Sequence, residues 1–80
     1  MALLSPIPAE VRALMTAADR QNIETVIKVR NRYAESSDLW NGYQEMLVAL
    51  EQIASAHNTM FAAQEKLDIA NARQYLSEML

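Results

Sequence analysis

The stretch from Asp38 to Met79 constrains this chain most, because it contains no proline and only one glycine. Large apolar residues recur in it at every seventh position: Leu39, Met46, Ile53, Met60 and Leu67, with Gln74 continuing the series. The positions three residues further on are all small: Gly42, Ala49, Ala56, Ala63, Ala70 and Ser77. We call these twelve residues the large–small stripe. The repeat predicts one long helix, about residues 38–79, that can approach another helix closely.

The length of this predicted helix favours a partner chain. About 42 residues at about 1.5 Å each span about 60 Å, which exceeds the width of an 80-residue globule. A break near residues 56–59 is the alternative, and it would fold the chain into a compact four-helix domain. We favour a continuous helix because the large–small stripe runs through residues 56–59 in phase, whereas a turn is expected to reset it.

The stripe also predicts how the helix pairs. In an antiparallel pair each large position faces a small position of the second copy. A two-fold axis near Asn58 brings Met60 opposite Ala56 of the second copy, and every other layer likewise pairs a large with a small residue. On the flank of the stripe Glu45 then meets Arg73, and Thr59 meets its own copy. The sequence therefore predicts an antiparallel homodimer, although the chain's own short helices are an alternative cover for the alanines.

A second apolar strip lies beside the stripe on the same predicted helix: Trp40, Tyr43, Leu47, Leu50 and Phe61. It offers the N-terminal part of the chain a surface to pack on without covering the alanines. Core packing is the ordinary role of such aromatics. A ligand pocket behind Trp40 and Tyr43 is the alternative.

The N-terminal half predicts an extended arm and two short helices. Pro6 and Pro8 favour an extended arm over residues 1–7, and Pro8 suits a first helical turn. Apolar residues at helical spacing then predict a helix over about residues 8–19. The polar run from Asp19 to Asn22 predicts a turn, with Asn22 capping a second helix over about 23–35. Ser36 or Ser37 is the expected cap of the long helix. The fold class is therefore all-α, as one domain of residues 1–80.

Composition limits the function further. The net charge of −3 argues against nucleic-acid binding, and the absence of cysteine excludes disulfides and thiolate metal sites. No apolar run approaches the about 20 residues of a membrane span, and residues 1–4 lack the features of a secretion signal. We expect a soluble, cytoplasmic protein without a membrane partner.

Residues that carry chemistry are few. His57 is the only histidine. Its ordinary role is that of an exposed or singly bonded histidine, and the alternative is a pH-sensitive pair with its own copy near the predicted axis. No phosphate loop, metal-ligand cluster or catalytic set is recognisable, so we expect no enzyme, cofactor or metal site. A small basic cluster is formed by Lys28, Arg30 and Arg32. It suits an acidic partner, and the alternative is a solvated helix face without a partner.

The tripeptide Trp40-Asn41-Gly42 lies mid-chain between predicted helices. In this Trp-x-Gly pattern the chain resembles the WXG100 family of secreted helical hairpins. That family also carries a C-terminal Tyr-x-x-x-Asp/Glu signal, whereas here Met79 stands four residues after Tyr75. Separately, Pro8–Arg30 resembles a short helical segment found before some bacterial outer-membrane barrels.

Together the patterns predict a small protein–protein interaction protein: an adaptor, inhibitor or assembly subunit that forms a homodimer and binds another protein. A regulator that binds a small ligand or peptide between the short helices and Trp40/Tyr43 is the first alternative. The resemblance adds a secreted WXG100-like hairpin as the second.

Overall fold

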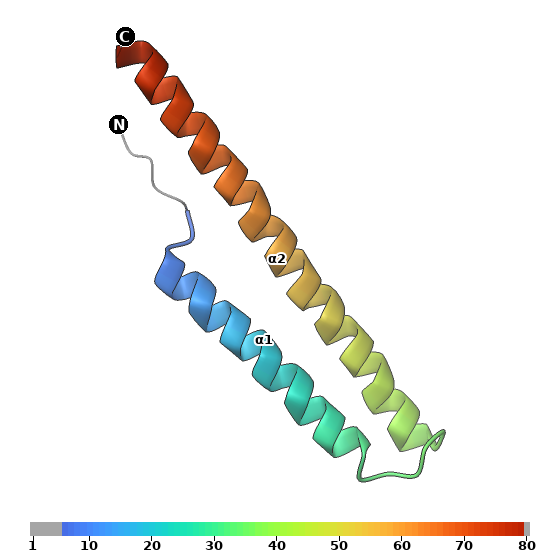
Figure 1. Ribbon diagram of the computed structural model, residues 1–80. Coiled ribbons are helices and arrows are strands. Elements are labelled where there is room, and N and C mark those ends of the chain that lie inside the picture. The colour runs from blue at the N-terminus through green and yellow to red at the C-terminus, as the bar shows by residue number, and fades with distance from the viewer. Residues whose placement is uncertain (1–5, 80) are drawn as a thin grey trace.

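The computed structural model describes residues 6–79 and shows two antiparallel helices. Helix α1 comprises Ala9–Arg30 and helix α2 comprises Asp38–Met79, joined by a connection over residues 31–37 (Figure 1). The described chain contains no strand, and it measures 66 × 18 × 11 Å. The predicted all-α class and the long helix are thus confirmed. Most of the predicted arm, residues 1–5, lies outside the described part.

Helix α2 begins at the predicted cap. Ser37 Oγ accepts a hydrogen bond from the backbone N–H of Trp40 at 3.2 Å, which satisfies one of the free donors of the first turn. Asp38 lies in that turn, where the helix dipole favours a negative charge. Ser36 holds a left-handed backbone, with φ of 68°. The connection therefore reverses the chain direction without a glycine.

The predicted turn between Asp19 and Asn22 is wrong, and α1 is continuous from Ala9 to Arg30. Among the residues of α1 that are at least partly buried, those that face α2 keep one helical phase through this segment: Arg12, Met15, Asp19, Ile23, Val26 and Arg30. The polar residue Asp19 does not mark a turn. It lies on the side of α1 that faces α2, where it contacts His57. The predicted second helix, about 23–35, is also too long, since residues 31–35 lie in the connection.

Helix α1 packs on the second apolar strip of α2. Leu47 and Phe61 of that strip and Val26 of α1 are the buried apolar residues of the described chain, and Trp40, Tyr43 and Leu50 are partly buried. The small positions of the large–small stripe stay exposed, from Gly42 to Ser77. Thus α1 does not cover the alanines, and the alternative in which the chain's own helices do so is not what the hairpin shows.

Helix α2 extends past α1 at its C-terminal end. Arg12, near the start of α1, lies level with Glu65, to which it binds at 2.9 Å. The remaining turns of α2, up to Met79, lie beyond the first residue of α1 (Figure 1).

Two substitutions test these assignments together. We expect Asn22→Ala to stabilise the fold by about 0.5 kcal/mol, because Asn22 is an exposed residue inside a helix and alanine has the higher helix propensity. We expect Ser37→Ala to destabilise it by about 1 kcal/mol, because a cap is lost. Urea unfolding measures both. If Asn22→Ala instead destabilised the fold, the result would contradict a continuous α1 and support the predicted turn with Asn22 as a helix cap.

Candidate interaction surface and hairpin interface

Three polar contacts join the two helices at intervals along the hairpin. Arg30 Nη1 donates to Gln44 Oε1 at 2.6 Å, His57 Nδ1 lies 2.7 Å from Asp19 Oδ2, and Arg12 Nη1 donates to Glu65 Oε1 at 2.9 Å. Each contact pairs one residue of α1 with one of α2. These contacts fix the register of α1 along α2, that is, which residues of the two helices lie opposite each other.

The central contact is the most sheltered ion pair. The side chains of His57 and Asp19 are 29% and 17% exposed, against 27% and 64% for Arg12 and Glu65. An ionised carboxylate only accepts hydrogen bonds, so Nδ1 of His57 carries the hydrogen. The hairpin therefore agrees with a singly bonded His57 and not with the alternative pairing of His57 with its own copy, because the imidazole already has a partner on α1.

The end of the hairpin near the connection is filled by aromatic and guanidinium groups. The Arg30 guanidinium lies 5.1 Å from the centre of the Trp40 ring. Tyr33 and Tyr43 stack with ring centres 5.8 Å apart and planes within 8° of parallel. These contacts occupy the space behind Trp40 and Tyr43, which is the location of the alternative ligand pocket. They also remove Arg30 from the predicted basic cluster and leave Lys28 and Arg32 exposed.

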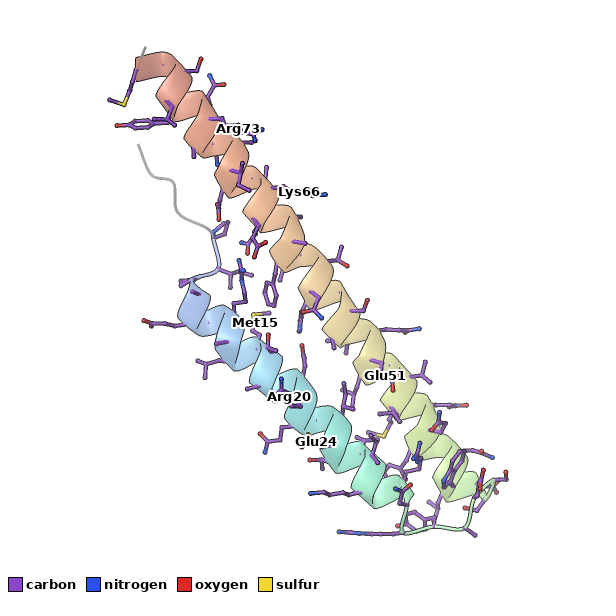
Figure 2. All side chains as sticks on the ribbon, viewed as in Figure 1. Met15, Arg20, Glu24, Glu51, Lys66 and Arg73 are labelled. Carbon is purple, nitrogen blue, oxygen red and sulfur yellow. The ribbon has the colours of Figure 1, made fainter. Side chains whose placement is uncertain are left out.

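The opposite end is also partly polar. Arg12 lies 5.1 Å from the centre of the buried Phe61 ring, as well as binding Glu65. Gln64 is only 7% exposed, and neither its Oε1 nor Arg12 Nε has a hydrogen-bond partner within the described structure. Figure 2 shows Met15 close by, directed into the space between the helices. The interface thus holds several polar groups among few apolar ones.

The large–small stripe forms a continuous exposed surface on α2. Its large positions are 56% (Leu39), 50% (Met46), 47% (Ile53), 38% (Met60) and 61% (Leu67) exposed. The small positions between them are exposed as well. Exposed apolar surface that runs the length of a helix is typical of an interaction site. Arg73, on the predicted charged flank, lies on the part of α2 past α1 (Figure 2).

Two hollows lie on different flanks of the hairpin. One, of about 280 Å3, lies at the start of the stripe and is lined by Leu39, Gly42 and Met46 of the stripe together with Asp38 and Tyr43. No atom lies within 4 Å of where a Cβ on Gly42 would be. The other, of about 320 Å3, lies between the helices and is lined mainly by Thr16, Arg20, Ile23 and Glu24 of α1 with Ala54 and Asn58 of α2.

Comparison with known proteins gives no match: no protein-family model, curated protein or solved structure is similar to this chain. The likeness to WXG100 hairpins therefore rests on Trp40 to Gly42, which lie in the first turns of α2. Within residues 6–79, no three His, Cys, Asp or Glu side chains gather as metal ligands would. Neither helix of that range contains an apolar stretch long enough to cross a membrane.

The structure separates the predicted residues into two groups. It brings Arg30 onto Trp40 and stacks Tyr43 on Tyr33 at the end near the connection. It leaves the ten residues of the large–small stripe between Leu39 and Ala70 on the surface. Three interface residues were not predicted from the sequence: Arg12, Asp19 and Gln64. For Arg12 and Asp19 the spacing carried a signal, since Arg12, Asp19 and Val26 are seven residues apart.

We expect Asp19→Ala to destabilise the hairpin by about 1–2 kcal/mol, because a charge-assisted contact to His57 is lost in a sheltered position. Glu24→Ala is the matched control on the same helix, where the side chain is exposed, and its effect should stay within about 0.5 kcal/mol. Thermal unfolding followed by circular dichroism compares them. Equal effects of the two variants would show that the Asp19–His57 contact does not hold the helices together.

Proposed function

We propose that this protein is a small protein–protein interaction protein, an adaptor, inhibitor or assembly subunit, that forms an antiparallel homodimer through the large–small stripe of α2. One observation carries the proposal: α1 packs on the neighbouring strip, and the stripe's large residues stay 38–61% exposed. A face with this regular pattern has no cover within the described hairpin.

The second copy fits this face better than an arbitrary partner because the stripe is complementary to itself. With the two-fold axis near Asn58, Met60 lies over Ala56 of the second copy, and Ile53 over its Ala63. Glu45 lies beside Arg73 of the second copy, so opposite charges meet on the flank. A parallel pair would place alanine on alanine and glutamate on glutamate.

The energies involved are of the right order for a reversible dimer. Burying a large apolar side chain fully contributes about 1.5–3 kcal/mol. Covering the exposed half of five such residues on each copy therefore contributes on the order of 10 kcal/mol, against about 4–15 kcal/mol for the freedom lost on association. The hairpin alone buries only three apolar residues within the described range, so it also gains most from a partner.

Gly42 supports close contact with a second helix. Glycine in a helix interior costs about 1 kcal/mol relative to alanine, and a Cβ here would meet open space. Nothing within the hairpin therefore requires glycine at this position. In the proposed pair Gly42 lies opposite Gln74 of the second copy, in the hollow between Leu39 and Met46.

We expect Ala63→Leu to weaken dimerisation by about 1–3 kcal/mol through overpacking of the seam. Ala62→Leu is the matched control, because Ala62 is also exposed but lies outside the stripe. Sedimentation equilibrium gives the dimer dissociation constant, and circular dichroism checks that both hairpins stay helical. The proposal fails if both variants associate like the wild-type protein.

Single cysteines report the orientation, since the chain has none of its own. We expect Thr59→Cys to form a disulfide with its own copy, because it flanks the stripe at the axis, while Asn58→Cys, on the opposite side of α2, does not. Glu45→Cys should crosslink with Arg73→Cys in a mixed sample. Efficient self-crosslinking of Glu45→Cys would instead indicate a parallel pair.

A further inference from the structure

We infer that α1 of one copy packs against α1 of the second copy around Ala18, so that two hairpins form a four-helix bundle. The inference rests on the proposed pairing of α2 and adds a second contact surface, on α1. The exposed flank of α1 around Ala18 is the surface, and the same flank of the second copy is its occupant.

The hollow between the helices shows which flank of α1 lies on the side of the stripe. Asp19 and His57 face each other across the hairpin. The residues that follow them, Arg20 and Asn58, line one hollow together and so share one flank. Successive helical residues point about 100° apart. The residues that precede them, Ala18 and Ala56, therefore point to the opposite flank, and Ala56 belongs to the stripe.

Symmetry places the two α1 helices on the same side of the α2 pair. The two-fold axis of an antiparallel pair runs perpendicular to both helices and to the line between them. Rotation about this axis does not change a direction parallel to it. If α1 is displaced from its α2 along the axis, α1 of the second copy is therefore displaced from its own α2 in the same direction. On α2 the strip that faces α1 is rotated by about 100° from the stripe. The four helices therefore occupy the corners of a square, as in an antiparallel bundle.

The level of the axis selects the residues that meet. The proposed axis passes near Asn58, which follows His57, and His57 binds Asp19 at 2.7 Å. The axis therefore crosses α1 at about Asp19 as well. Asp19 itself points to α2, and so the flank residue nearest the axis is Ala18. Its small side chain allows two α1 helices to approach.

The flank on either side of Ala18 suits such a contact. Val11 is 42% and Leu14 is 71% exposed there. Counting outward from Ala18, Val11 meets Thr25 of the second copy and Leu14 meets its Asn22. These residues and the partly buried Val29 are uncharged, whereas Glu10, Arg20, Glu24 and Lys28 of α1 lie on its other faces. Absence of charge on one exposed flank favours a buried contact.

Charge substitutions on the axis test this contact, because a residue there meets its own copy. We expect Ala18→Glu alone and Ala18→Lys alone each to dimerise about tenfold more weakly or worse, since like charges are brought together. An equal mixture of the two should form mainly the mixed dimer, with near wild-type affinity. Native mass spectrometry counts the three species. Ala17→Glu and Ala17→Lys are the controls, from an exposed neighbour that points away from the flank.

The result separates this contact from the α2 pairing. Self-crosslinking of Thr59→Cys reports the α2 pairing in each sample independently of α1. If Thr59→Cys crosslinks but the Ala18 mixture shows no preference for the mixed dimer, the α1 contact is overturned and the proposed function stands. If Thr59→Cys fails to crosslink, both proposals fall. Preference for the mixed dimer with the Ala17 variants, too, would overturn the assignment to Ala18.

Discussion

The architecture depends on one helix, α2, which carries two apolar strips on different sides. Leu47 and Phe61 belong to the strip that α1 covers, and they are 5% and 6% exposed. Met46 and Met60, one residue earlier in each case, belong to the stripe and are 50% and 38% exposed. A helix with two such strips cannot bury both in one hairpin, because a single neighbouring helix covers only one side. The uncovered large–small stripe is therefore the reason to expect a second chain.

The hairpin interface is better suited to fixing a register than to stabilising a monomer. The described apolar core comprises Val26, Leu47 and Phe61, whereas the Asp19–His57 contact and the two arginine contacts run along its length. Sliding α1 by one turn, about 5.4 Å, would separate all of these polar pairs at once. Buried polar groups commonly specify register in paired helices at some expense of stability. The proposed association would add stability to a hairpin built in this way.

How much the sequence predicted differs between the two halves of the chain. In α2 the seven-residue repeat predicted the helix, the serines before Asp38 predicted a cap at Ser36 or Ser37, and the second apolar strip predicted the side on which the N-terminal part packs. In α1 the repeat was hidden, because Arg12, Asp19 and Arg30 occupy positions that face α2. Polar residues between apolar ones read as a turn, although neither glycine nor proline interrupts residues 9–30. An unbroken helical phase, the reason for predicting a continuous α2, also runs through α1 and would have predicted one continuous helix there. The residues of α2 that Asp19 and Arg12 contact, however, are identified only by the structure.

The hairpin register and the proposed dimer register are independent of each other, and yet they agree. The first is fixed within one chain by the contact between Asp19 and His57. The second comes from matching large with small residues along α2, which sets the axis near Asn58. Nothing requires these two levels to coincide. Because they lie one residue apart on α2, the middle of α1 falls on the axis, and α1 extends to both sides of it. With a different hairpin register, the middle of α1 would lie away from the proposed two-fold axis. One end of each α1 flank would then have no counterpart in the second copy. In the proposed dimer, this coincidence gives the α1 flank a symmetric partner along most of its length.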